Sequence, residues 1–136
     1  MQPVWSTALP ACVAVRVCDT KIVQPEDLRP GIQLFNSAEF FEAHEVLEDV
    51  WRAAPEPDRK FLQGLIQVAV ALHHHSRGNL VGCRSLLDRA RRNLLLYPAQ
   101  HRGLDLAALI HSLEQWRQAL DEGRAMPALP TLHLSP

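Results

Sequence analysis

The sequence predicts an all-α fold, a compact antiparallel bundle of about five helices with irregular N- and C-terminal segments. Of its 136 residues, 47% are hydrophobic but only 6% are aromatic, and this composition suits helix-on-helix packing better than a β-sandwich. Apolar residues in the middle of the chain recur at helical spacing. Prolines, glycines and capping residues divide this region into segments joined by short loops, which favours antiparallel neighbours.

The chain divides into three parts. Residues 1–24 show no helical period and predict an N-terminal arm that is extended or loose, although the apolar stretch 11–17 is also compatible with a short strand. Residues 25–122 form the predicted helical domain. The tail, 123–136, contains three of the ten prolines, so we expect it to be irregular or disordered.

The first predicted helix is short, and a second one follows it directly. Pro30 is suited to the first turn of a helix that ends near Asn36. Residues 36–39, Asn-Ser-Ala-Glu, match a capping box in which Asn36 caps the second helix and Glu39 reaches back to it. We expect this second helix to continue to about Ala53, where two nearby prolines end it.

Three longer helices are predicted after these prolines. A third helix spans about residues 58–77, a fourth runs to about residue 97, and a fifth spans residues 105–122. The residues that set these boundaries are Pro55, Pro57, Gly78, Asn79, Pro98 and Gly123. Asn79 is a typical N-cap, and glycines directly after a helix favour its C-terminal cap.

Charge and composition narrow the classes of function. The net charge is -1, so the chain as a whole does not favour nucleic acid as a partner. The arginines between residues 84 and 92 are interpreted as a solvated helix face, with an acidic partner or RNA as the alternative. The longest apolar run, residues 65–72, falls far short of the roughly 18 residues of a membrane span. With no signal-peptide pattern and three cysteines in no disulfide framework, we expect a cytoplasmic protein without a membrane partner.

The second helix carries an apolar stripe and a polar stripe. At about 100° per residue, the stripe facing the core comprises Phe40, Ala43, Leu47, Val50 and Trp51. A second stripe comprises Phe41, Glu45, Glu48 and Arg52, with His44 between the two stripes. His44, Glu45 and Glu48 therefore lie within one turn, at the border of buried and exposed surface. A histidine and a carboxylate four residues apart can share a hydrogen bond or a metal ion.

The third helix is apolar on nearly all sides and should therefore be central. Arg59, Gln63 and Gln67 interrupt it at four-residue spacing, and His74 continues this line with His73 close by. A buried amide needs a hydrogen-bond partner, and the preceding helix offers several. We expect Gly64 to let the two helices approach. The predicted polar cluster between the second and third helices comprises His44, Glu45, Glu48, Arg59, Gln63, Gln67 and one of His73 or His74.

The segment Phe35–Trp51, with the pattern Phe-Asn-x-x-x-Phe-Phe-Glu-x-His-Glu-x-Leu-Glu-x-x-Trp, resembles the signature of the domain-of-unknown-function 309 family. The resemblance continues through Arg59, residues 64–67, Ala69, His73 and residues 77–79, and it covers about residues 34–96. It implies a compact all-helical fold of about five helices and no particular activity. Cys83 stands where a small residue such as alanine is expected.

The polar cluster has three interpretations, of which the first is a structural network. Glu45 or Glu48 would pair with Arg52 or Arg59, and the glutamines would bond helix carbonyls or each other. Such a network fixes helix register without any ligand.

The second interpretation is a reactive site. A divalent metal, Zn, Mn or Fe, would be held by His44, Glu48 and His73, or His74 in its place. The order of these residues differs from both the di-metal carboxylate bundles and the His-Glu-x-x-His zinc motif. A metal-free hydrolase-like site would instead use Glu45 as base and Arg59 as an anion anchor.

The third interpretation is an adaptor or homo-oligomerising protein. Phe41 lies on the polar stripe, where an exposed ring could dock a partner helix or a second copy of the chain. The junction at residues 77–79 could bind an anion through its backbone amides. The sequence identifies neither a small-molecule ligand nor a reaction, and it leaves open whether the chain is an enzyme.

Overall fold

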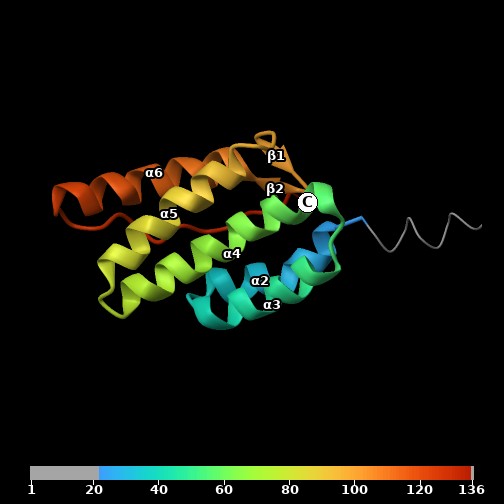
Figure 1. Ribbon diagram of the computed structural model, residues 1–136, viewed down its shortest axis with the longest axis horizontal. Helices are drawn as coiled ribbons and strands as arrows, with labels where there is room; N and C mark the ends of the chain where they lie inside the picture. The colour runs from blue at the N-terminus through green and yellow to red at the C-terminus, as the bar shows by residue number, and fades with distance from the viewer. Residues whose placement is uncertain (1–21, 136) are drawn as a thin grey trace, which may run out of the picture.

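The computed structural model describes residues 22–135, so most of the predicted N-terminal arm, including the candidate strand 11–17, lies outside the described residues. The described part contains five helices and one small hairpin (Figure 1). Their bounds are α2 Pro25–Asn36, α3 Phe40–Ala53, α4 Glu56–Ser76, α5 Leu80–Leu94, β1 Gln100–His101, β2 Leu104–Asp105 and α6 Leu106–Glu122. The predicted all-α bundle of about five helices is confirmed.

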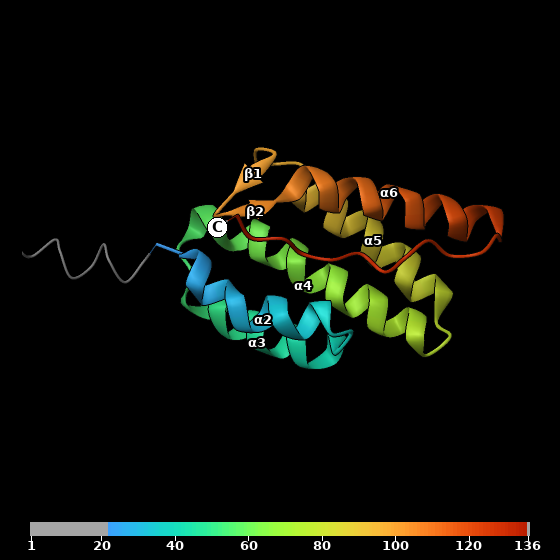
Figure 2. The same cartoon turned by 180° about the vertical axis from the view of Figure 1, so that it is seen from behind.

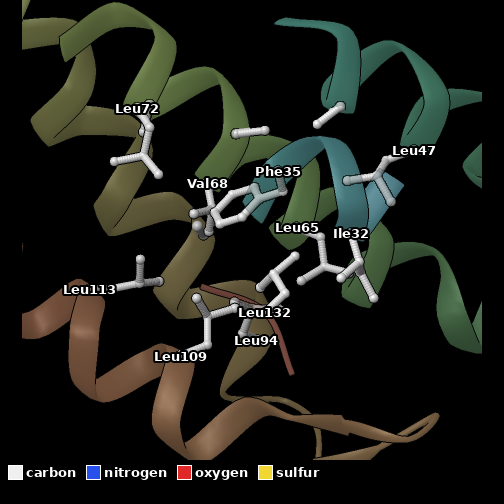
Figure 3. Close-up of a cluster of buried hydrophobic side chains, with 14 of the residues drawn as sticks. Ile32, Phe35, Leu47, Leu65, Val68, Leu72, Leu94, Leu109, Leu113 and Leu132 are labelled. Carbon is white, nitrogen blue, oxygen red and sulfur yellow. The ribbon is translucent and has the colours of Figure 1, made fainter. Parts of the chain in front are cut away.

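Consecutive helices pack against one another, from α2 on α3 through to α5 on α6, and alternate in direction (Figure 1). α4 is central, as its apolar circumference predicts, because it packs on both α3 and α5. Its residues Phe61, Leu65 and Val68 are completely buried. Figure 3 shows Leu65 and Val68 among apolar side chains of the other helices, including Ile32 and Leu109.

The prediction that Pro30 lies in the first turn of its helix is wrong. The helix begins at Pro25, and Gln24 and Asp27 form a capping box there, in which the Asp27 carboxylate accepts from the Gln24 backbone N–H at 2.9 Å. Pro30 lies inside the helix and removes the N–H that would bond the Glu26 carbonyl. Both residues are exposed, so this carbonyl can bind water instead, and the helix continues.

The capping box predicted at residues 36–39 is also wrong. Asn36 is the last residue of α2, and its side-chain amide bonds the backbone of Leu132 in the tail, donating to the carbonyl at 2.9 Å and accepting from the N–H at 2.8 Å. Glu39 precedes α3 without a side-chain cap, and Ala38 turns the chain with φ of 64°. The Asn36 side chain therefore bonds Leu132, a residue distant in the sequence, instead of capping α3 as the local pattern predicted.

The other predicted helix boundaries agree with the structure to within a few residues. Asn79 caps α5 by accepting from the Gly82 N–H at 2.9 Å. Gly78 and Gly123 follow α4 and α6 with φ of 80° and 66°, in the left-handed region where glycine carries no steric penalty. α5 ends at Leu94, three residues before the predicted end.

Residues 123–135 contain no helix, but this part of the tail runs along the bundle (Figure 2). Leu132 is only 2% exposed and belongs to the hydrophobic core. Leu134 forms an antiparallel bridge with Leu104 of the unpredicted hairpin, and the Trp116 indole donates to the Ala128 carbonyl at 2.9 Å. The tail is therefore irregular, as expected, but it is part of the folded structure.

Gly64 has a different neighbour from the one predicted. A Cβ at this position would lie 2.8 Å from the Leu94 side chain, so Gly64 lets α4 approach α5 rather than α3. Gly31 does the same between α2 and α3, since its Cβ would lie 2.8 Å from Leu47. In the region that the structure describes, no helix is long and apolar enough to cross a membrane.

Candidate functional site

The predicted site residues lie along the line where α3 and α4 meet, here called the α3–α4 seam. Because the two helices are antiparallel, the start of α3 faces the end of α4, and the end of α3 faces the start of α4. The Phe41 ring lies 5.4 Å from the His73 ring at one end of the seam. At the other end, the Arg59 guanidinium carbon lies 4.0 Å from the centroid of the Trp51 ring.

The Phe41 end of the seam is aromatic and partly open. Phe41 is 47% exposed, and its ring centroid lies 4.9 Å from that of His44. The Nδ1 atom of His44 is 2.6 Å from the Phe41 carbonyl oxygen, so Nδ1 donates and carries a proton. The other ring nitrogen, Nε2, faces a Glu48 carboxylate oxygen at 3.8 Å. Phe41 thus lies between two imidazoles, one from each helix.

The middle of the seam contains a surface pocket of about 210 Å³, lined by Glu48, Trp51, Gln63, Ile66 and Gln67. Gln63 is exposed. The Oε1 atom of Gln67 accepts a hydrogen bond from Asn93 of α5 at 2.9 Å. Gln67 therefore forms its hydrogen bond with α5 rather than with the predicted partners on α3, although it lines this pocket together with Glu48.

The Trp51 end has an unusual polar group. The Trp51 indole N–H is buried and has no hydrogen-bond partner among residues 22–135. Such an unpaired donor costs about 1–3 kcal/mol, partly offset by the cation–π contact of Arg59, worth about 0.5–2 kcal/mol. Arg59 stacks on the ring, whereas Glu48 faces Arg52 of its own helix at 3.8 Å. Among residues 22–135, no ion pair links α3 to α4, so the part of the predicted network that would join the two helices by charge is not formed.

Glu45 and His74 lie apart from the pocket lining. Glu45 is exposed, and His74 accepts from the Asn79 side chain at 3.3 Å in the α4–α5 loop. Within residues 22–135, no three His, Cys, Asp or Glu side chains are grouped so that they could hold a metal ion. The metal set of His44, Glu48 and His73 therefore stays a hypothesis, and no grouping in the described region supports it.

The arginines of residues 84–92 are partly neutralised within the fold. Arg84 pairs with Asp121 at 2.9 Å, and Arg91 pairs with Glu114 at 2.8 Å. Both acidic residues lie on α6, so these pairs link the α5 and α6 surfaces. The pairs are exposed and contribute little stability individually.

The sequence analysis missed a buried ionic cluster around Asp58, in the first turn of α4. Asp58 is 1% exposed, and its carboxylate accepts from His101 Nε2 at 2.9 Å and from the Arg102 Nε and Nη2 atoms at 3.2 and 2.9 Å. Burial by itself would raise the pKa of Asp58, but the hydrogen bonds from Arg102 and His101 and their charges lower it overall.

This cluster fastens the β1–β2 hairpin to the start of α4. The His101 ring lies 4.7 Å from both Phe61 and Tyr97, and the Tyr97 hydroxyl donates to the Pro57 carbonyl at 2.7 Å. With both carboxylate oxygens bonded, the arrangement acts as a structural latch. The sequence signal that could have predicted this hairpin is Gly103. Arg102 and Gly103 form its two-residue turn, and both have the positive φ that such a turn requires.

Comparison with known proteins links these features to a family. Residues 28–86 match the family described as "Domain of unknown function (DUF309)". The chain is 37% identical over 81 residues to the "Uncharacterized protein YpuF" of Bacillus subtilis (strain 168), an alignment covering 59% of this chain and 45% of that protein. It is 30% identical over 93 residues to an "Uncharacterized protein" of Aquifex aeolicus (strain VF5), covering 68% of this chain and 28% of that protein.

The matched residues include all of α3 and α4, so the whole α3–α4 seam lies inside the family region, whereas the hairpin, α6 and the tail lie after it. The chain spans less than half the length of both relatives. The motif from Phe35 to Trp51 and the match over residues 28–86 show that this part of the chain is similar to the DUF309 family.

Proposed function

We propose that the chain is a binding module that docks a short segment of a partner protein along the α3–α4 seam. The observation that carries this proposal is the exposure of Phe41 at one end of a seam that also contains a surface pocket. In the part of the chain that the structure describes, Phe41 is the one aromatic residue among the exposed large hydrophobic side chains. Exposed aromatic rings with polar neighbours are typical of the residues that dominate binding energy at protein interfaces.

The dimensions of the seam fit a short peptide. Phe41 and Trp51 are ten residues apart in α3, which corresponds to about 15 Å along a helix. An extended peptide covers this distance with about five residues, at roughly 3.3 Å each. The seam therefore suits a short linear segment rather than a large globular surface.

The chemistry of the seam changes along its length. An apolar side chain would contact Phe41, and backbone or amide groups would bond Gln63 and Glu48 in the pocket. At the far end, the guanidinium of Arg59 offers a positive charge that suits an acidic side chain. We therefore expect a preferred ligand with an apolar residue at one end and an acidic residue at the other.

The hydrolase-like alternative receives less support from the same geometry. It needs Glu45 and Arg59 to face one substrate. Glu45 is exposed and does not line the pocket, whereas Arg59 is stacked on Trp51. Binding of a peptide along the α3–α4 seam does not require these two side chains to face the same ligand group.

The test is selection of binders from a random peptide library with the full chain, followed by NMR mapping. Selected peptides should shift amide resonances of residues 41–51 and 59–73. Phe41→Ser should weaken binding at least about tenfold, equivalent to about 1.4 kcal/mol. The matched control is Val81→Ser on α5, since Val81 is 81% exposed and lies off the seam; it should leave the affinity unchanged.

Two results would contradict the proposal. One is a library that yields no peptide binding in the micromolar range or tighter. The other is a set of binders whose affinity is indifferent to Phe41→Ser and whose resonance shifts fall outside α3 and α4.

A further inference from the structure

The tail, taken here as residues 124–135, is bound to the bundle in the manner of an extended peptide ligand. Figure 2 shows it running back from the end of α6 towards the hairpin. Hydrogen bonds hold its backbone at several places along its length. Ala128 accepts from the Trp116 indole at 2.9 Å, Leu132 is bonded by Asn36, and Ser135 donates to the Gly103 carbonyl at 2.7 Å.

From Pro130 to Leu134, the side chains of the tail alternate between more buried and exposed positions. Pro130 and Leu132 are buried and Leu134 is half-buried, while Thr131 and His133 are exposed. This period of two is that of an extended segment with one face on a surface. Leu132 is the anchor, and Figure 3 shows it close to Leu94 and Leu109.

The hydrogen bonds that hold the tail recognise its backbone. Asn36 both donates to the carbonyl and accepts from the N–H of Leu132, at 2.9 and 2.8 Å. Asp105 donates its N–H to the His133 carbonyl at 3.2 Å, and Leu104 and Leu134 form an antiparallel bridge. The tail thus extends the hairpin, as in peptide recognition by strand addition, where backbone bonds give affinity and side-chain pockets give selectivity.

We propose that this surface, the tail site formed by Asn36, Gly103–Asp105 and Trp116, is a peptide-binding site that accepts the tail of a second copy of the chain in place of its own. The tail is the segment that the structure shows to fit, and every bond described above would form equally in trans. The connection from α6 passes through Gly123, Arg124 and Ala125, all exposed, so the exchange would bury no new surface at the hinge.

The covalent connection decides which copy supplies the tail. A short linker holds its segment at an effective concentration in the millimolar range, so the tail of the same chain wins in dilute solution. Exchange becomes measurable at high protein concentration or when the chain's own tail is weakened. The tail site lies on α2, α6 and the hairpin, so tests of tail exchange are independent of tests of binding at the α3–α4 seam.

The first test uses a fluorescent peptide of residues 125–135 and the full chain carrying Leu132→Ala. Binding should be saturable and at least tenfold tighter than to the unmodified chain, whose own tail competes. A peptide with Leu132→Ala should bind at least tenfold more weakly. The matched control is a peptide with Leu129→Ala, because Leu129 is 47% exposed, and it should bind like the original. Adding Asn36→Ala to the protein should also weaken binding at least tenfold.

The second test keeps the chain unmodified, in case the Leu132→Ala protein does not fold. The protein is refolded over a range of concentrations and its mass is measured by size-exclusion chromatography with light scattering. A dimer fraction that rises with refolding concentration, and that Leu129→Ala leaves unchanged, supports tail exchange. A strict monomer at every concentration, or a folded Leu132→Ala chain that does not bind the peptide saturably, overturns it.

Discussion

Replacing Asp58 by alanine tests the latch between α4 and the hairpin. The carboxylate is 1% exposed and accepts three hydrogen bonds, one from His101 and two from Arg102. The side chains of these partners are 17% and 32% exposed. Asp58→Ala therefore leaves two partly buried donors without their acceptor, and the small alanine side chain replaces none of the bonds.

The expected loss of stability follows from these exposures. Removing one partner of a buried ion pair costs about 3–5 kcal/mol. The Arg102 side chain is 32% exposed and can regain part of its hydration, which places the loss near the lower end, at about 3 kcal/mol. This is a large share of the total stability of a small domain, about 5–15 kcal/mol.

Urea unfolding at neutral pH, followed by far-UV circular dichroism, measures the loss. With a denaturant slope of about 1–3 kcal/mol/M, the midpoint should fall by about 1–3 M. The matched control is Asp49→Ala. The Asp49 carboxylate also pairs with an arginine, Arg52, at 2.6 Å, but its side chain is 76% exposed, so its removal should lower the free energy of unfolding by no more than about 1 kcal/mol. Equal losses in the two variants would refute the argument from burial.

Three further predictions use the same unfolding assay or simple chemistry. Because the pKa of Asp58 is lowered in the folded chain, the stability that its ionised form contributes should be complete above its unfolded pKa of about 4 and be lost as the pH falls through the lower folded pKa. The stability difference between the wild type and Asp58→Asn should therefore shrink in acid, and a difference that grows would contradict this. Gly64→Ala should lower stability by about 1–3 kcal/mol through overpacking against the buried Leu94, and an unchanged melting temperature would show that Leu94 can move. Cys83 is fully buried, and burial raises its pKa to about 11, so in a background without the other cysteines a thiol reagent should label it only when the chain unfolds; rapid labelling of the native protein would contradict this.

The helices could be predicted because their signals are local. The wheel of α3, the apolar circumference of α4, and the caps at Asn79 and Gly123 each depend on residues within one or two turns. The family resemblance points to the same region as the α3–α4 seam. The pairing of α3 with α4 followed from a short loop, which leaves two adjacent helices little choice but to lie antiparallel.

The partners of individual polar groups could not be predicted in this way. Gln67 of α4 was expected to form a hydrogen bond with a residue of α3, but it bonds Asn93 on α5. Since α4 packs between α3 and α5, a polar side chain on it has possible partners on both neighbouring helices. Arg52 and Arg59 were both open as partners of Glu45 or Glu48. Arg59 stacks on Trp51, whereas Glu48 faces Arg52, one turn away on its own helix, as one of these alternatives predicted.

The sequence by itself determined the all-α class, the approximate helices and the residues of the seam, since helical periodicity and capping are properties of neighbouring residues. Only the tertiary structure decided the roles of Asn36 and Asp58. The partner of Asn36 is 96 residues away in the sequence, and those of Asp58 are 43 and 44 residues away. A hydrogen bond or ion pair requires its atoms to meet within about 3 Å, and only the packing of the whole chain determines which distant atoms come that close.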